Sequence, residues 1–165
     1  ASASASAVPF SGKLDASAQK RRSLCRLLWS VGADLRIGPR TTATAAQFFQ
    51  RFFLLESFGD GHFEPKLVAM ASLWLASKVC EEQAKLRDIV NSFMALGPNG
   101  ATGSPLNLEP YWQLRDQLVL YEQALLRALG FDVTGTTAHS CLLELVLAVV
   151  GSGTDSADGN DGNDG

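Results

Sequence analysis

Two charged residues at the edges of apolar segments are the best candidates for a functional site. Lys78 directly follows an uncharged stretch, residues 67–77. At about 100° per residue, Glu122 lies at the edge of an apolar helical stripe, flanked by Leu118 and Leu125. Long charged side chains are rarely buried without a partner. Each charge is therefore expected either to pair within the chain or to contact another molecule.

Residue patterns typical of catalysis or metal binding are scarce. The two histidines, His62 and His139, are not close in sequence to a plausible nucleophile and acid. Cys25, Cys80 and Cys141 lack metal-ligand spacing, and three thiols do not make a disulfide framework. The sequence also lacks a phosphate-binding glycine-rich loop and a His-x-x-x-His motif. We therefore predict a binding module rather than an enzyme, with no cofactor and no metal.

Composition favours one domain, and three cysteines that do not make a disulfide framework favour a reducing compartment. The 165 residues are 46% hydrophobic, which is enough for a sizeable core. A net charge of −3 disfavours direct nucleic acid binding, because duplex-binding surfaces are normally basic. The opening residues lack the basic start and the long apolar run of a signal peptide. There is no initiator Met, so the sequence fits either a fragment or a processed form.

The stretch 65–80 is predicted to be the central helix of the fold. It is rich in Ala, Leu and Met, which have high helix propensity, and Pro65 suits the first turn. It is too short and too interrupted to cross a bilayer, so no membrane partner is expected. A helix that is apolar on every side is typically surrounded by other helices.

Five further helices are predicted from apolar residues that recur at helical spacing, at about 15–31, 41–58, 86–96, 110–129 and 136–150. Gly32 is expected to stop the first, and Thr41 or Thr42 to cap the second. Pro110 is expected to start the fifth and Gly130 to end it. Thr136 or Thr137 is expected to cap the sixth, and Gly151 to end it. No strand-period segment of useful length is present, so the predicted fold class is all-α.

Both ends of the chain are predicted to be disordered. Residues 1–14 are rich in Ala and Ser, and residues 152–165 in Asp, Gly and Asn. The acidic tail faintly resembles a calcium loop, but its spacing is wrong and the closing glutamate is missing. The basic run Lys20, Arg21 and Arg22 is expected to be a solvated helix face, with docking or targeting as the minor interpretation.

Four segments together resemble a cyclin box. Residues 67–81 look like its central helix, with the pattern Ala-x-x-x-Leu-Ala-Ser-Lys, and residues 44–53 are similar to its second helix. Residues 86–91 match its fourth helix, and residues 121–133 its fifth helix and exit. Gln-Arg-Phe-Phe and Leu-Arg-Asp-Ile-Val-Asn look most like the transcription and RNA-processing cyclins of the L, K and T types.

The resemblance implies a cyclin-box bundle of five helices over residues 15–133, followed by one helix of an incomplete second repeat over 134–151. It implies that Lys78, Glu122 and Glu81 bind a kinase, since cyclins meet their kinase partner at these positions. The chain would then form a heterodimer with a cyclin-dependent serine/threonine kinase and activate it without doing chemistry itself. A nuclear location and a role in RNA polymerase II transcription or RNA processing also follow from this resemblance.

The sequence departs from the cyclin pattern at several positions. Cys80 replaces the first of two family glutamates, whereas Glu81 keeps the second. The family's proline a few residues later is absent, which would allow a longer central helix. The second repeat stops after the sixth helix, which is apolar over most of its circumference and would expose that surface unless something covers it.

Two alternatives to a kinase-activating cyclin follow from the sequence. Transcription factor IIB shares the fold and binds DNA, but the acidic balance disfavours that reading. A helical adaptor or truncated cyclin would bind a partner without activating it. Lys78 and Glu122 would also be explained by an intramolecular ion pair that closes the core, and such a pair is compatible with a face that meets a partner.

Overall fold

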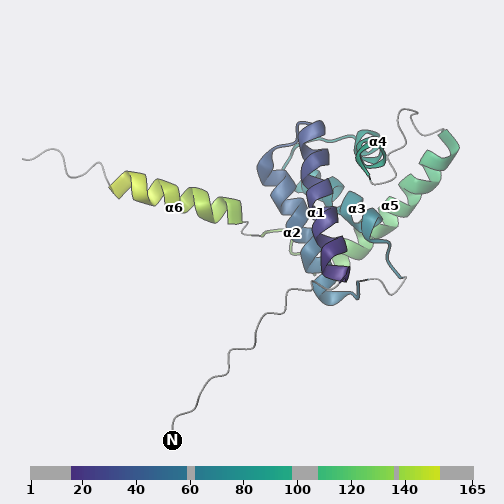
Figure 1. Ribbon diagram of the computed structural model, residues 1–165, viewed down its shortest axis with the longest axis horizontal. Helices are drawn as coiled ribbons and strands as arrows, with labels where there is room; N and C mark the ends of the chain where they lie inside the picture. Colours follow the sequence, from purple (N-terminus) through teal and green to yellow (C-terminus); the bar gives the residue numbers. More distant parts are fainter. Residues whose placement is uncertain (1–15, 59–61, 98–107, 136–137, 153–165) are drawn as a thin grey trace, which may run out of the picture.

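The computed structural model describes residues 16–58, 62–97, 108–135 and 138–152 (Figure 1). Helices are the regular elements in these ranges, which confirms the predicted all-α class. The six helices, in chain order, are α1 (Ala16–Asp34), α2 (Pro39–Leu55), α3 (Pro65–Val79), α4 (Leu86–Leu96), α5 (Leu108–Ala128) and α6 (Ala138–Ser152). Of the residues predicted to be disordered, 1–14 and 153–165 fall outside the described residues, as do the predicted caps Thr136 and Thr137, whereas Ser152 is the last residue of α6.

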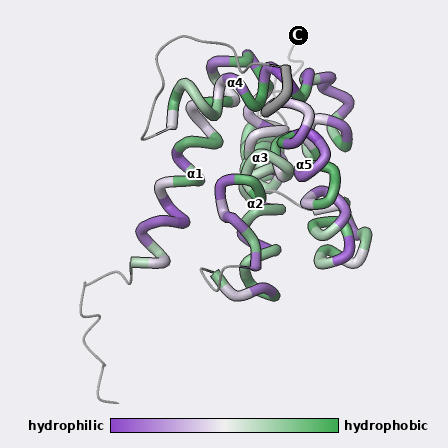
Figure 2. The backbone as a smooth tube through the Cα atoms, turned by 90° about the vertical axis from the view of Figure 1, so that its right-hand side faces the viewer, coloured by the Kyte–Doolittle hydropathy of each residue, from purple (hydrophilic) through white to green (hydrophobic). Residues whose placement is uncertain are grey.

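Helix α3 is the centre of the bundle, as its composition predicts. It packs against α2, α5, α1 and α4, and lies between them in Figures 1 and 2. Most of its side chains are buried, including the hydroxyls of Ser72 and Ser77. These hydroxyls donate hydrogen bonds of 2.7 Å to the backbone carbonyls of Val68 and Trp74. Because the two serines are satisfied within the helix, α3 can be enclosed on several sides without an unpaired polar group.

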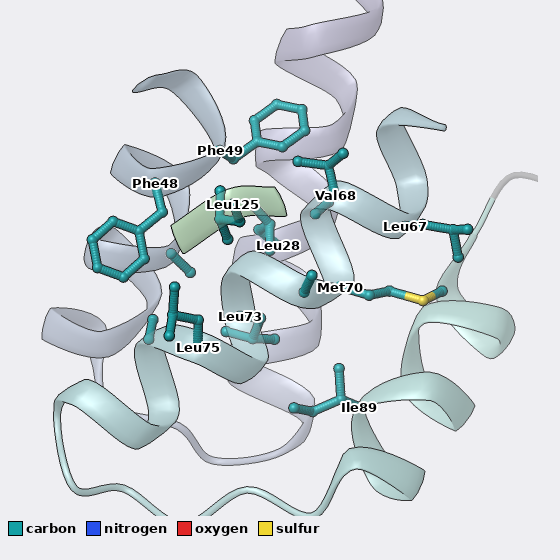
Figure 3. Close-up of a cluster of buried hydrophobic side chains, with 14 of the residues drawn as sticks. Leu28, Phe48, Phe49, Leu67, Val68, Met70, Leu73, Leu75, Ile89 and Leu125 are labelled. Atoms are coloured by element: carbon teal, nitrogen blue, oxygen red, sulfur yellow. The ribbon is translucent and has the colours of Figure 1, made fainter. Parts of the chain in front are cut away.

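Phenylalanines of α2 form the largest part of the core beside α3 (Figure 3). Phe48 and Phe49 are fully buried, and Phe52 and Phe53 nearly so. The rings of Phe49 and Phe53 meet edge to face with centroids 5.1 Å apart, a favoured aromatic geometry. The residues that complete the core across the other helices include Leu28, Leu73, Ile89, Phe93, Leu118 and Leu125.

The start of α2 differs from the sequence prediction. The helix begins at Pro39, and Gly38 is the N-cap residue, so neither Thr41 nor Thr42 caps it. Pro39 fits the first helical position because its missing N–H needs no partner there. Thr42 is buried inside the helix, and its hydroxyl donates back to the Gly38 carbonyl at 3.2 Å. The threonine hydroxyl therefore serves a backbone carbonyl rather than the free N–H groups of the helix start.

Several other helix ends also differ from the prediction. Helix α1 continues past Gly32 to Asp34, so Gly32 does not stop it. Gly32 instead lies where α1 closely approaches α2, because an added Cβ would clash with the Thr42 hydroxyl. The missing proline does not lengthen α3, which ends at Val79. Helix α5 begins at Leu108, two residues before Pro110, and α6 runs to Ser152, one residue past Gly151. The glycine and proline residues expected at helix ends therefore predicted those ends to within a few residues.

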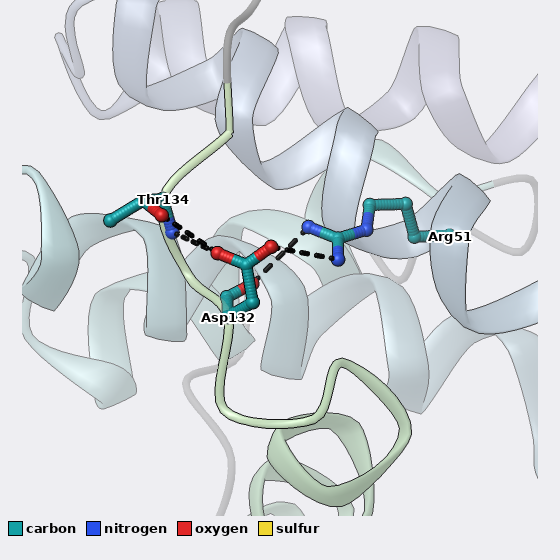
Figure 4. A network of polar contacts seen from close by, with 3 residues as sticks. All are labelled: Arg51, Asp132 and Thr134. Carbon is teal, nitrogen blue, oxygen red and sulfur yellow. Dashed lines mark hydrogen bonds and ion pairs between the residues drawn. The ribbon is translucent and has the colours of Figure 1, made fainter.

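The exit from α5 is fixed by a turn and a small polar network. Gly130 has a φ of 62°, the left-handed conformation that glycine adopts without a steric cost, as predicted for a helix end. Arg51 of α2 then donates to the Asp132 carbonyl at 3.2 Å and pairs with its carboxylate at 3.5 Å (Figure 4). Asp132 Oδ1 also accepts hydrogen bonds from the Thr134 hydroxyl at 2.7 Å and the Thr134 N–H at 3.1 Å. These contacts set the direction in which the chain leaves the bundle.

Replacing Thr134 with valine is expected to raise the pKa of Asp132 toward its ordinary value. The hydrogen bond from the Thr134 hydroxyl is the largest cause that holds this pKa below the usual range, and the charge of Arg51 contributes less. Carbon-13 NMR titration of the carboxyl group would measure the change, with Arg51→Gln as a comparison expected to shift it less. Because the folded pKa is depressed, the network stabilises the fold above the unfolded-state pKa and loses this effect as pH falls through the folded pKa. A Thr134→Val titration identical to wild type would contradict this assignment.

Helix α6 extends away from the bundle and is connected to it through residues 133–135 (Figure 1). It contacts α2. Its leucines and valines are largely exposed; Leu145, for example, has 61% of its surface accessible. The predicted exposed apolar surface of the sixth helix is therefore present in this structure. In the part of the chain that the structure describes, no helix is long and apolar enough to span a membrane.

Candidate protein-interaction site

Lys78 and Glu122 meet at the edge of the bundle. Lys78 is in the last turn of α3, and Glu122 is on α5 between the buried residues Leu118 and Leu125. Packing of α5 against α3 brings Lys78 Nζ within 2.6 Å and 2.9 Å of the two carboxylate oxygens of Glu122. The Lys78 side chain is 46% exposed and that of Glu122 13%. The intramolecular ion pair considered from the sequence is therefore formed, and its lysine is accessible to another molecule.

Trp74 is a third member of this site that the sequence interpretation missed. It precedes Lys78 by one helical turn, and Lys78 Nζ lies 3.4 Å from the centroid of its ring. A cation over the face of an aromatic ring at this distance is attracted by the ring quadrupole. Residues i and i+4 of a helix are neighbours on its surface, so a tryptophan four residues before the lysine was the available signal.

Glu81 lies beside Lys78 in an open cleft of about 710 Å³, and its backbone N–H donates to the Lys78 carbonyl at 3.2 Å. The cleft is lined by Trp74, Ser77, Lys78, Glu81, Gln83, Ala84 and Lys85. Glu81 is exposed and has a φ of 58°, an uncommon conformation for a residue other than glycine. The structure thus places Lys78 with Glu122 and Lys78 with Glu81, whereas Glu122 does not line the cleft.

Glu82 connects the loop after α3, which lines part of this cleft, to the start of α2. Its carboxylate accepts a hydrogen bond of 2.7 Å from the N–H of Gly38, the N-cap residue of α2. A negative group at a helix N-terminus is favoured by the helix dipole. The contact is close, so a Cβ added at Gly38 would force the Glu82 carboxylate to move. The contact spans 44 positions of the sequence, so local spacing gave no signal for it.

The described residues near this site give little support for metal binding or for a reactive thiol. Among the described residues, no group of three or more His, Cys, Asp or Glu side chains is placed to hold a metal ion. Cys80 is half-buried, with its Sγ 3.9 Å from the Thr44 hydroxyl. At the other half-buried thiol, burial raises the pKa of Cys25 and thereby disfavours the nucleophilic thiolate. The ion pair, the indole ring and the cleft lie together at an accessible edge of the bundle.

Comparison with known proteins identifies the family. The family description "Cyclin, N-terminal domain" matches residues 4–134, which is most of the chain. The chain belongs to the cyclin family. The cyclin-box prediction is therefore confirmed, and the all-α bundle around α3 agrees with it.

Curated relatives include Cyclin-L1 and a yeast cyclin. This cyclin is 36% identical to Cyclin-L1 of Danio rerio over 121 residues, which are 72% of this chain and 24% of the relative. It is 35% identical to Cyclin-L1 of Homo sapiens over 122 residues, with coverage of 72% and 23%. Identity to Cyclin pch1 of Schizosaccharomyces pombe is 34% over 138 residues, with coverage of 83% and 40%. The chain thus spans less than half the length of each of these relatives.

A solved structure shares the fold at low sequence identity. One chain of the crystal structure of the yeast RNA Pol II CTD kinase CTDK-1 complex superposes with a TM-score of 0.68. The match covers 80% of this cyclin and 42% of that chain, at 20% identity. This likeness supports the architecture, and the L-type matches agree with the grouping expected from the sequence.

Proposed function

We propose that this cyclin binds a cyclin-dependent serine/threonine kinase as a heterodimer and activates it through a face formed by Lys78, Glu122 and Glu81. The observation that carries the proposal is the Lys78–Glu122 pair at the accessible edge of an otherwise enclosed helix. Membership of the cyclin family supports a regulatory rather than a catalytic role. The solved relative is itself named as part of a kinase complex.

The proposed mechanism is stabilisation of one kinase conformation. A kinase is active when its own Lys–Glu pair and its metal-binding aspartate are in place. A partner that binds this conformation more tightly than the inactive one shifts the population toward it. The Lys78–Glu122 pair joins α3 to α5, so it offers the kinase a surface whose two helices are already held together. We further propose a nuclear role in RNA polymerase II transcription or RNA processing, on the basis of the L-type relatives.

A second candidate function is an adaptor that binds a kinase without activating it. The exposed apolar surface of α6 favours this alternative, because such surfaces commonly mark protein interaction sites. Activation requires placement of the kinase's own catalytic groups, whereas binding requires contact alone. The two functions therefore differ in kinase activity and not in complex formation.

The test is a binding and activity assay with the purified catalytic subunit of the yeast CTD kinase complex and with other cyclin-dependent kinase subunits. The double variant Lys78→Ala/Glu122→Ala is expected to weaken binding and activation by about tenfold or more, or about 1.4 kcal/mol. The variant should still fold, because both partners are removed together and no unpaired charge is left at this partly buried edge; circular dichroism would check this.

Arg51→Ala/Asp132→Ala is the matched control, because it removes the other ion pair of the described residues and does not touch the cleft. It is expected to leave kinase activation unchanged. Binding without activation by the wild-type chain would favour the adaptor function. Equal kinase activation by the wild type and the Lys78/Glu122 variant would show that these two residues are not part of the interface.

A further inference from the structure

Two arginines and two aromatic rings form a continuous row from α4 to α5. Arg87 is in the first turn of α4, and its guanidinium carbon lies 5.9 Å from the centroid of the Tyr111 ring of α5. The Tyr111 ring meets the Trp112 ring edge to face, with centroids 5.6 Å apart. The guanidinium carbon of Arg115 lies over the Trp112 ring, 5.2 Å from its centroid. These four residues are called the arginine–aromatic row below.

The rings of the row hold the two guanidinium groups at the surface. A cation over the face of an aromatic ring is attracted by the ring quadrupole. A guanidinium group is planar, so it can pack on a ring and still direct its N–H donors sideways to another molecule. Arg87 and Arg115 are exposed, and half of the Trp112 surface is accessible. The row therefore presents accessible donors on side chains that the rings help to position.

No carboxylate neutralises the two arginines of the row in the part of the chain that the structure describes. The ion pairs found there use other side chains. Asp88 follows Arg87 directly, but it lines a separate cleft beside the link between α1 and α2. Asp116 follows Arg115, and side chains one residue apart on a helix do not face each other. The two positive charges of the row are thus available to an anion from another molecule.

The chemistry of the row fits a phosphoryl group. Arg115 follows Tyr111 by four residues, so it is a neighbour of that ring on α5, and both arginines border the same tyrosine. A phosphoserine carries a charge of about −1.5 to −2 at pH 7, which matches two guanidinium groups, and it has three acceptor oxygens. Arginine often binds phosphate through two parallel hydrogen bonds, and arginine clusters recognise phosphorylated segments.

A nucleic acid strand fits this surface less well. Such a strand is a polyanion, and proteins normally bind it through many basic contacts. The chain has a net charge of −3, and the row supplies two cations. Charge complementarity therefore favours a partner with one local anionic group over a partner that is negative along its whole length.

We propose that the arginine–aromatic row binds a phosphorylated peptide segment of a partner protein, with the phosphoryl group held between Arg87 and Arg115. Tyr111 and Trp112 position the two guanidinium groups. Arg115 lies seven residues before Glu122, which is about two turns along the same side of α5, so the row borders the proposed kinase face. Binding at the row needs no contact with a kinase, and it is therefore separable from the proposed function.

The experiment measures binding of the full chain to labelled peptides in the absence of a kinase. A library of phosphoserine peptides with varied flanking residues selects the best binder. Fluorescence anisotropy then gives its dissociation constant beside that of the same peptide without phosphate. The phosphorylated form is expected to bind about tenfold more tightly or better.

Variants of the row test which groups give this preference. Arg87→Gln/Arg115→Gln is expected to abolish it. Arg87→Lys/Arg115→Lys keeps both charges and is expected to retain only part of it, because lysine lacks the planar pair of donors. Circular dichroism would establish that each variant is folded.

Arg22→Gln/Arg26→Gln is the matched control, because it removes two exposed arginines of α1 that lie outside the row. It is expected to leave the preference unchanged. Equal affinity for the two peptide forms, or a preference that persists in Arg87→Gln/Arg115→Gln or falls equally in the control, would overturn the proposal. Tighter binding of a single-stranded RNA than of the phosphopeptide would assign the row to nucleic acid instead. Phosphopeptide binding by a chain that binds no kinase would support this site and overturn the proposed function alone.

Discussion

Ala71→Asp is expected to prevent the bundle from folding. Ala71 is fully buried in the middle of α3, with α2, α5, α1 and α4 packed around that helix. An aspartate there would place an unpaired carboxylate in an apolar interior, at a cost of several kcal/mol even after relaxation. Because a domain is typically stable by about 5–15 kcal/mol, this cost is a large part of the total. Far-ultraviolet circular dichroism and size-exclusion chromatography would measure the loss of the fold.

Ala95→Asp provides the control for this prediction. Ala95 lies on α4 and is exposed, so an aspartate at that position keeps its hydration. Its one expected penalty is the unfavourable position of a negative charge near a helix C-terminus, which costs less than about 1 kcal/mol. A folded Ala71→Asp protein with a stability close to that of Ala95→Asp would show that α3 is not enclosed as described.

Phe49→Ala is expected to lower the free energy of unfolding by about 3–5 kcal/mol. Phe49 is fully buried on α2, and its ring packs edge to face against Phe53. Removing the ring loses its burial and leaves a cavity between α2 and α3 that close-packed neighbours fill only in part. Urea unfolding followed by near-ultraviolet circular dichroism would give the change in stability.

Leu54→Ala on the same helix is the comparison for Phe49→Ala. Leu54 is 78% exposed, so its truncation is expected to change stability by no more than about 0.5 kcal/mol. The difference between the two variants measures burial, because both remove a large apolar side chain from α2. Similar values for the two would argue against the core position of Phe49.

Sequence reasoning predicted the fold well because its signals are local. The uncharged run before Lys78 and the apolar spacing of the other helices each report a face or a surface of one helix. Helix starts were less well predicted, because Thr42 donates its hydroxyl back to Gly38 instead of capping the helix. A threonine near a helix start can either accept a hydrogen bond from a free N–H or donate one to a preceding carbonyl, and residue spacing alone does not tell which occurs.

Only part of the candidate site could be predicted from the sequence. Lys78, Glu81 and Glu122 entered through their resemblance to cyclin positions, and the ion pair between α3 and α5 remained one of two readings. The contact between Glu82 and Gly38 depends on how the loop after α3 meets the start of α2. Such a contact is set by tertiary packing, and no local pattern encodes it.

The exposure of α6 affects how the chain responds to heating. Helices α1 to α5 share one core, so they are expected to melt together in a cooperative transition. Helix α6, with its 15 residues and exposed leucines and valines, receives little support from that core. Isolated helices of about 12–15 residues are marginal in water and lose helicity gradually with temperature. The total helical signal of the chain is thus the sum of a gradual decline and a sharp step, and a single melting temperature describes only the step.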